Sequence, residues 1–578
     1  KLPNHFKINN NYVVPQLMPS DLEAHLVLLG AFHRLKEEVL SLKGIKADIP
    51  MEPEERWAVF LQRAVYRFEQ WAIRMIGGEG QEEEESSKPR TLEPNEVPPL
   101  DVLMVWHTYM LNPRTYHEDC IRKLPGLLRI GSLPLVQLAS SIDQETLLPH
   151  PASEGRVSAF SSFTEQPFEP PINTTSEETV TVFCPSCSQP NTIPWITYKG
   201  DGYAQRAFGC ACSHCKFEFN KETLGMRKFF EDFQRFMMDT SRNFMANTVL
   251  DYQTGLAANP DMSNLLCLQY LRLREGMNPI RPESLGKQIG WTFKALEAYC
   301  RTGLMARRDK PHMGTPRQLS ILIAPYRSPG LASLDLASAV MRQMGFIDKM
   351  VNLGFTEPGR WEDDNDTLTR CVVRYHHFLD LMAAMPGKFA VPTLDIDLAW
   401  HTHQLLCDSY RKLRNIIGIV PDHDDKVGQG ALSTAYDKTA EAWKELYGVP
   451  YSVCGCIPVI NSLDIEDGGS SSGFSLFSKK GKSKAEAPEK PVTNPRPDLI
   501  SASNDAAGQT HASDHDSVAI INPGQTNKAQ AQARGHELSK RAKELGKGVA
   551  KGKADGWAEL MSKREVDHSP SFLCPVQY

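Results

Sequence analysis

The sequence predicts a mainly α-helical protein, in which two related helical units flank an inserted small β module and a disordered tail ends the chain. Three short blocks of sequence recur in the same order in the two halves. Two pairs of closely spaced cysteines lie between these halves, in a stretch that looks like short strands. From about residue 465 the chain is rich in Gly, Ser, Lys, Asn and Pro, with few aromatic residues. Such a segment cannot bury enough apolar surface to order itself.

The clearest repeat is centred on a Trp-His pair. Segments 99–109 and 393–403 align without a gap at a spacing of 294 residues. Two earlier blocks recur as well, at spacings of 314 and 307 residues. Because the three blocks keep their order, the sequence predicts an internal duplication of one helical unit. The matched residues include Asp21, Phe32, Arg67, Phe68, Asp101, Trp106 and His107 in the first copy, and Asp335, Phe346, Arg374, Tyr375, Asp395, Trp400 and His401 in the second.

Changes in composition set the predicted boundaries. Residues 151–180 are rich in Pro, Ser, Thr and Glu, as a linker is, whereas residues 221–310 return to helical periodicity. The predicted order is a first helical repeat unit (1–150), a linker (151–180), a β ribbon (181–220), a helical connector (221–315), a second helical repeat unit (316–460) and a basic, low-complexity, disordered tail (461–578).

The overall composition is that of a globular protein and excludes several classes. Hydrophobic residues make up 41% and charged residues 23% of the 578 positions. A net charge of -6 gives no global reason to expect a nucleic-acid partner. There is no apolar run of about 18 residues, so we expect no membrane-spanning helix. The first residues lack the apolar core of a signal peptide.

Two C-x2-C pairs separated by 24 residues are the strongest motif in the chain. A tetrahedral zinc ion takes four soft ligands at about 2.3 Å, and each pair supplies two of them from one tight turn. Cys184, Cys187, Cys212 and Cys215 therefore predict a zinc ribbon, in which the closed four-thiolate site is structural. The alternative is four thiols that merely share this spacing. Cys210 is a further thiol that could compete with Cys212 for the ion.

The remaining cysteines bear on the compartment. Thirteen cysteines are scattered or closely paired in a long chain, which favours reduced thiols and metal binding in the cytoplasm or nucleus over a disulfide framework. The pair Cys454 and Cys456 could bind a soft metal or lie buried as inert thiols.

The second Trp-His segment carries additional metal-type ligands. Asp397 and His401 are four residues apart and share a helix face, so the carboxylate could orient the imidazole or join it on a metal. His403 lies roughly 200° further around the helix, and an ideal helix does not aim both histidines at one ion. The alternative interpretation is that His107 and His401 are hydrogen-bonded core residues that orient the repeat.

A third group of ligands follows downstream. His423 and Asp425 form the His-x-Asp pattern of a non-heme iron site, with His401 or His403 as the third ligand. An aspartate just before a helix is also an ordinary N-cap, which is the simpler reading. The predicted second site therefore comprises Asp397, His401, His403, His423 and Asp425, with a metal that the sequence does not identify.

Segments 100–108, 112–120, 397–405 and 423–425 together resemble the glycine-rich domain-containing protein family of plants and fungi. The resemblance extends over roughly residues 15–460, and the cysteine pairs are similar to those of its fungal-type branch. It implies a role without an established reaction, since plant relatives are linked to development and stress responses and some carry an RNA-binding segment. This chain has no glycine-rich C-terminal domain and no aromatic RNA-recognition motif, which argues against an RNA role.

The sequence supports three functional hypotheses and leaves the oligomeric state open. The first is an intracellular zinc-binding scaffold with protein partners, since we find neither a nucleophile constellation nor a phosphate-binding glycine loop. The second is a metal-dependent enzyme, with an iron or other site in the second unit. The third is a nucleic-acid-binding protein that uses the ribbon and the tail, where residues 526–565 contain ten Lys or Arg against five acids. The acidic body argues against the third.

Overall fold

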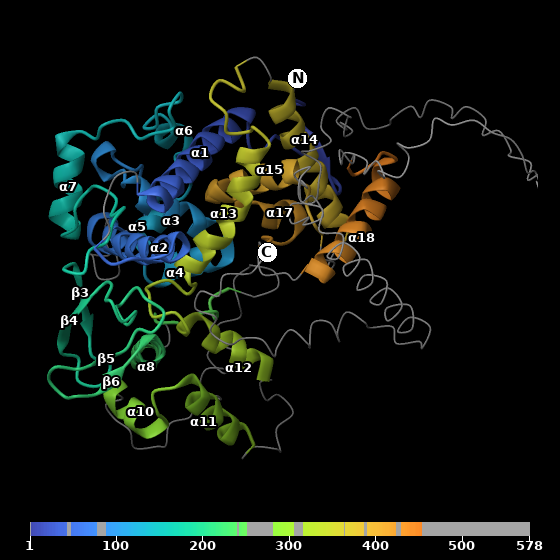
Figure 1. The fold of residues 1–578 in the computed structure, drawn as a ribbon. Helices are drawn as coiled ribbons and strands as arrows, with labels where there is room; N and C mark the ends of the chain where they lie inside the picture. The colour runs from blue at the N-terminus through green and yellow to red at the C-terminus, as the bar shows by residue number, and fades with distance from the viewer. Residues whose placement is uncertain are drawn as a thin grey trace, which may run out of the picture.

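Figure 1 shows the computed structural model of the chain, which describes residues 2–42, 48–77, 88–239, 242–250, 281–305, 316–362, 365–385, 390–422 and 429–452. The described part is mainly helical, with three two-stranded antiparallel sheets, so the predicted fold class is confirmed. The predicted tail and the pair Cys454 and Cys456 lie outside the described residues. Within the described ranges, no helix is both long enough and apolar enough to cross a membrane.

The first half is built on the helices α1 (Pro19–Ser41), α2 (Pro53–Gln70) and α3 (Leu100–Met110). A proline opens α1 and α2, because its ring presets the helical φ and the missing N–H is one that a first turn leaves unpaired. Helix α2 runs on into a π-helical turn, η1 (Trp71–Gly77). The further elements of this half are η2 (Pro94–Glu96), α4 (Pro113–Arg122), α5 (Pro125–Ile130), α6 (Leu135–Ala139) and α7 (Glu154–Thr164).

Helix α7 lies inside the stretch that the sequence predicts as a linker. The side chain of Ser153 accepts a hydrogen bond from the backbone N–H of Arg156, which caps the helix, and Phe160 is buried. Composition alone did not indicate this helix, because its exposed face includes Glu and Ser residues of the kind that a linker contains.

A connector of helices joins the halves. It comprises α8 (Lys221–Met238), α10 (Pro282–Ile289), α11 (Phe293–Met305), α12 (Pro316–Ile323) and η3 (Ala324–Tyr326). Phenylalanines of α8 pack into a separate core with residues of the other connector helices. The strands between α7 and α8 are β3 (Thr179–Phe183), β4 (Pro190–Pro194), β5 (Cys210–Ala211) and β6 (Glu218–Phe219).

The second half repeats the pattern of three main helices, α13 (Leu336–Asn352), α14 (Asn365–Ala384) and α15 (Leu394–Leu405). An N-terminal hairpin of β1 (Phe6–Ile8) and β2 (Asn11–Val13) packs on α14, where the ring of Phe6 stacks on His376 at 4.0 Å. The shorter helices are α16 (Cys407–Tyr410), α17 (Leu413–Ile417) and α18 (Gln429–Tyr447).

The first main helix of each half packs on helices of the other half. Helix α1 packs not only on α2 and α3 but also on α14 and α15, while α13 packs on α2 and α3 of the first half. Figure 1 shows α1, α3, α13 and α15 together at the centre of the upper body. One continuous apolar core therefore contains buried residues of both halves. Neither half can bury its own apolar surface without the other, so they are expected to unfold together.

A buried arginine–aspartate pair occurs at the same place in each half. Arg67 Nε lies 2.6 Å from the carboxylate of Asp101, and Arg374 Nε lies 2.6 Å from the carboxylate of Asp395. Each aspartate is in the first turn of the Trp-His helix, α3 or α15. Each arginine also donates to a distant backbone carbonyl, that of Phe168 in the first half and that of Tyr451 in the second.

The tryptophans of the two Trp-His segments also have equivalent partners. The indole N–H of Trp106 donates to the hydroxyl of Tyr116 at 3.0 Å, and that of Trp400 donates to the hydroxyl of Tyr410 at 2.9 Å. Both tyrosines lie ten residues after their tryptophan. This fourth match between the halves was not among the three blocks found in the sequence. The internal duplication stays a prediction, and these matched contacts support it.

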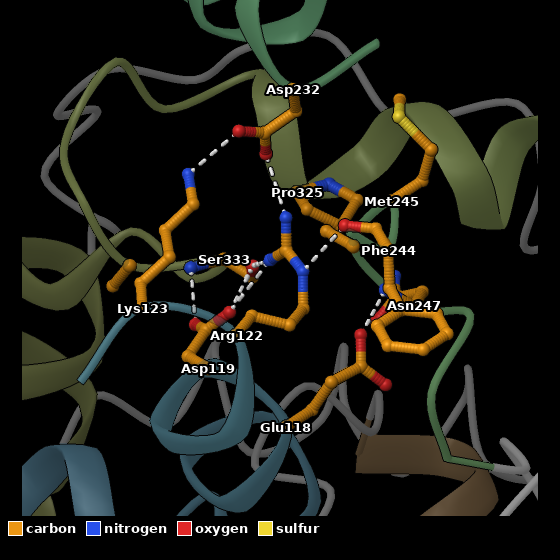
Figure 2. Close-up of polar contacts among 12 residues, drawn as sticks. Glu118, Asp119, Arg122, Lys123, Asp232, Phe244, Met245, Asn247, Pro325 and Ser333 are labelled. Carbon is orange, nitrogen blue, oxygen red and sulfur yellow. Dashed lines mark hydrogen bonds and ion pairs between the residues drawn. The ribbon is translucent and has the colours of Figure 1, made fainter. Parts of the chain in front are cut away.

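A buried network of charges joins the first half to the connector (Figure 2). Asp232 of α8 accepts from Arg122 at 2.7 Å and from Lys123 at 3.0 Å. Asp119 accepts from Arg122 at 3.1 Å and from the backbone N–H of Ser333 at 2.6 Å. Burial alone would raise the pKa of Asp232, but Lys123 and Arg122 hold it below its ordinary value. The network ties α4, α8 and the segment before α13 into one junction.

Breaking one buried arginine–aspartate pair should destabilise the body strongly. Arg374→Met leaves the carboxylate of Asp395 buried without its cation, a change that typically costs about 3–5 kcal/mol. The matched control, Arg34→Met, removes a partly exposed pair with Glu37 and should cost less than about 1 kcal/mol. Urea unfolding of both variants measures the difference. Equal losses would contradict a structural role for the buried pair.

Candidate metal centre

Each cysteine pair lies on a tight turn with the same hydrogen-bond pattern. In the first turn, the N–H of Cys184 donates to the carbonyl of Gln189, and the N–H of Ser188 donates to the carbonyl of Cys184, both at 2.9 Å. In the second turn, the N–H of Cys212 donates to the carbonyl of Phe217 at 2.9 Å, and the N–H of Lys216 donates to the carbonyl of Cys212 at 3.0 Å.

The residue that closes each turn has a left-handed backbone. Ser188 has φ of 59° and Lys216 has φ of 62°, a region that favours glycine. A side chain at these positions carries a small conformational cost that the rest of the turn must offset. The repeated pattern therefore indicates that the two turns are built to hold their sulfurs in place.

The four predicted sulfurs come together. Cys184 Sγ lies 3.7 Å from Cys215 Sγ, Cys187 Sγ lies 3.7 Å from Cys212 Sγ, and all four lie within 4.8 Å of one another. A tetrahedral ion with metal–sulfur bonds of about 2.3 Å separates its ligands by about 3.8 Å. The cluster therefore has the size that a metal ion such as zinc requires. Cys210, the competing thiol of the sequence analysis, is not part of this group.

The electrostatics of the thiols differ between the two turns. The N–H groups of Cys215 and His214 point at the sulfur of Cys212 and hold its pKa below the ordinary value, against the effect of burial. Burial raises the pKa of the Cys184 thiol. A divalent cation would favour the thiolate at all four positions, because a coordinating thiol is deprotonated.

Asn191 links the two turns, and the sequence analysis missed it. Its buried side-chain oxygen accepts from the backbone N–H of Ser213 at 2.9 Å, and its amide nitrogen lies 3.8 Å from Cys212 Sγ. The amide nitrogen also donates to the carbonyl of Gln189 in the first turn. An amide that bridges both turns restricts the orientation of the thiolates. Asn191 lies two residues after Gln189, on an inward position of β4, and this polar residue at a buried strand position could have indicated its role from the sequence.

The ribbon is packed between the first half and the connector. Tyr66 of α2 contacts Trp195 edge-on at 5.5 Å between ring centroids, and Arg63 pairs with Glu178 at 2.6 Å. On the other side, Arg227 of α8 donates to the carbonyl of Pro185, which lies within the first cysteine turn. The fold around the metal ligands is thus continuous with both neighbouring parts of the body.

In the second unit the structure brings together two of the predicted ligands. Asp397 and His401 lie on one face of α15, with 3.4 Å between the carboxylate and Nε2. The other ring nitrogen of His401 lies 3.4 Å from the side chain of Gln343, on α13. All three residues are buried.

The other predicted ligands do not join this pair within the described residues. The ring nitrogens of His403 contact the hydroxyls of Tyr375 at 2.8 Å and Ser409 at 3.1 Å, so both are engaged elsewhere. His423 and Asp425 lie outside the described residues. The cysteine cluster is the set of convergent metal ligands found in the described ranges, and a second metal site stays a prediction.

His25, which the sequence analysis did not single out, joins the two Trp-His helices. Its Nε2 lies 2.8 Å from Nε2 of His107, and its Nδ1 lies 2.8 Å from the hydroxyl of Thr402. Burial lowers the pKa of His25 well below its ordinary value and that of His107 to about 3. The alternative interpretation of His107 as a hydrogen-bonded core residue fits this geometry. The signal was the position of His25 on the apolar face of α1, among Leu22 and Leu29.

Comparison with known proteins gives a family match for the second half. Residues 316–412 match the family model described as glycine-rich domain-containing protein-like, a stretch that includes α13, α14 and α15. Glycine-rich domain-containing protein 2 of Arabidopsis thaliana is 38% identical over 133 residues, which is 21% of this chain and 16% of that protein. Glycine-rich domain-containing protein 1 of the same plant is 37% identical over 148 residues, or 22% of this chain and 17% of that protein. The matched region thus spans about a sixth of these relatives. No solved structure matches the chain.

Removing one thiol should release the ion and destabilise the ribbon. Cys187→Ser leaves three sulfurs, and structural metal binding is coupled to folding, so both the bound metal and the melting temperature should fall. Elemental analysis and thermal melting measure the two effects. The matched control is Cys210→Ser, which changes a nearby thiol outside the cluster and should retain the metal. Unchanged metal content in Cys187→Ser would contradict the assignment.

Mild acid should destabilise the body through its buried histidines. Burial holds the pKa of His107 at about 3 and that of His376 at about 4, below the value of about 6.5 that they have when unfolded. The unfolded chain therefore binds more protons, so stability is full above pH ~6.5 and is lost as the pH falls toward the folded values. Each such histidine costs about 1.4 kcal/mol per pH unit below ~6.5.

Urea unfolding at about pH 7.5 and about pH 5.5 checks this expectation, with metal content followed in parallel to separate the loss of the ion. The buried carboxylate Asp232, whose pKa is lowered, contributes stability that is lost only in stronger acid. A midpoint that does not move between the two pH values would contradict the prediction.

Proposed function

We propose that this chain is an intracellular zinc-binding scaffold of the glycine-rich domain-containing protein family, without a reaction of its own. The observation that carries the proposal is the closed set of four sulfurs, with opposite pairs 3.7 Å apart on two matched turns. Four thiolates fill a tetrahedral coordination sphere, which leaves no open position for a substrate. The ion would hold the ribbon together and supply no chemistry.

Zinc is the ion that the donor set favours. Four thiolates in a tetrahedral arrangement suit zinc or an iron–sulfur centre, and two short C-x2-C turns are the usual zinc arrangement. Among the described cysteines none forms a disulfide, which suits a reducing compartment such as the cytoplasm or nucleus.

A scaffold role follows from where the ribbon lies and what it exposes. The ribbon contacts α2 on one side and α8 on the other, so the ion would set the relation between the first half and the connector. Two aromatic residues on the ribbon remain exposed, Phe183 at 61% and Tyr198 at 75%. Exposed aromatic side chains on a rigid support are typical of protein-binding surfaces, so we infer protein partners.

We infer that the family assignment extends beyond the matched region to both helical units. The first half reproduces the buried contacts of the second, in Arg67 with Asp101 and in Trp106 with Tyr116. Duplication of one ancestral unit accounts for these pairs. Assignment to a fungal-type branch rests on the cysteine pairs alone.

One observation favours a second candidate function, that of a metal-dependent enzyme. Asp397 and His401 form a buried pair on α15, where the first copy of the segment has Leu103 in place of Asp397. A metal at this pair would need further ligands, for which His423 and Asp425 are the sequence candidates. Nucleic-acid binding through the ribbon and the tail stays a prediction, and the tail lies outside the described residues.

Metal stoichiometry separates the two candidates. The scaffold predicts about one zinc per chain, lost in Cys187→Ser and retained in His401→Ala. The enzyme predicts a second metal equivalent that disappears in His401→Ala while circular dichroism shows that the chain still folds. Elemental analysis of the purified chain and both variants measures this. Absence of any bound metal in the wild-type chain would overturn both.

A further inference from the structure

A small pocket lies where α2, the ribbon and the start of α13 meet. Its volume is about 50 Å³, enough for a molecule of a few heavy atoms. The chain brings these walls together from positions more than a hundred residues apart, and neither the metal cluster nor the Trp-His helices contribute to it. The lining residues that matter here are Tyr66, Glu69, Tyr203, Lys221 and Asp335.

Lys221, the first residue of α8, places its amine in the wall of this pocket. Nζ lies 3.2 Å from the centroid of the Tyr203 ring and 5.5 Å from that of Phe208. No described residue accepts a hydrogen bond from this amine or forms an ion pair with it within contact distance. An ammonium group has three donors, and Lys221 is half-buried without protein acceptors for them, which disfavours the charged form, although the ring face offsets part of that cost.

The charge state of Lys221 agrees with this geometry. Burial lowers the pKa of the amine to about 7, against the opposing influence of Glu69 and Asp335. A large fraction of the molecules therefore carries a neutral amine at neutral pH, which is the nucleophilic form.

Of the two carboxyl groups in the pocket wall, Glu69 is better suited than Asp335 to donate and accept a proton. One of its carboxylate oxygens accepts from the backbone N–H of Leu331 at 2.6 Å, and burial raises the pKa of Glu69. The carboxylate of Asp335 is already engaged, because it caps α13 through the backbone N–H and the hydroxyl of Ser338. Two carboxyl groups in the wall make the pocket a poor site for an anion, so a neutral electrophile suits it better.

We propose that Lys221 forms an imine with a small aldehyde or ketone that enters this pocket. The nitrogen lone pair attacks the carbonyl carbon, and the nitrogen gives up a proton while the oxygen gains one, which yields a carbinolamine. Loss of that hydroxyl as water then forms the C=N bond. Glu69 carries the proton in both steps, and neither step needs an oxidant or a reductant. The inference is independent of the metal and of the scaffold function.

The test is competition between lysines of the same folded chain. The full-length protein is treated at about pH 7 with glycolaldehyde and cyanoborohydride, which reduces any imine to a stable alkyl amine, and the labelled lysines are located by peptide mass mapping. Lys221 should be labelled at least about tenfold faster than the exposed Lys199, because an ordinary lysine is neutral in roughly one molecule in a thousand or fewer at this pH. Its labelling rate should reach half of its maximum near pH 7.

Three variants sharpen the result. Lys221→Arg keeps the positive charge but cannot form an imine, so the fast label should disappear, whereas Lys199→Arg should leave it unchanged. Glu69→Gln should slow the labelling of Lys221 without moving that of Lys199. If Lys221→Arg does not fold, the rate ratio within the wild-type chain still decides. Labelling of Lys221 at the same rate as Lys199, or slower, would overturn the proposal.

Discussion

Two buried arginine–aspartate pairs fix the central helices of this protein, and the rest of the body is arranged around them. A charge taken out of water is tolerated only where its hydrogen bonds are replaced. Arg67 and Arg374 each donate both to an aspartate in the first turn of a Trp-His helix and to a carbonyl far along the chain, although Nη1 of Arg374 is buried without a hydrogen-bond partner. Each pair therefore sets the start of a helix and, at the same time, anchors a segment that comes more than 45 residues later in the chain.

The packing of each first helix on the other half makes the two halves interdependent. Helix α1 covers α14 and α15, and α13 covers α2 and α3, so the apolar core is shared. At the crossing, His25 contacts His107 of its own half and Thr402 of the other. These buried polar contacts have few alternative partners, and they specify how the halves fit together more than they add to stability.

The cysteine ribbon lies between the first half and the connector and contacts both. Its own core is small, and a module of this size is seldom stable without a metal or a neighbour. Here it has both a ligand set of the right size and packed neighbours on two sides. The Lys221 pocket lies beside it, where three parts of the chain meet, which is a common place for small-molecule sites in proteins.

The sequence by itself determined the local features. The spacing of Cys184, Cys187, Cys212 and Cys215 identified the cluster, because the chemistry of each turn is contained in a few consecutive residues. The recurring Trp-His segments 99–109 and 393–403 likewise marked α3 and α15. Helix α7 escaped notice because its composition is that of a linker.

Only the tertiary structure decided which distant side chains meet. No local pattern relates the residues that meet when α1 and α13 pack on the opposite halves, or when His25 contacts His107. The same is true of the amide of Asn191 between the turns and of the amine of Lys221 over Tyr203. The separation of His403 from Asp397 and His401, by contrast, follows from helix geometry alone, since residues two apart on a helix face different neighbours. Spacing along a chain fixes the geometry of a turn or a helix, whereas contacts between elements depend on how their apolar faces pack.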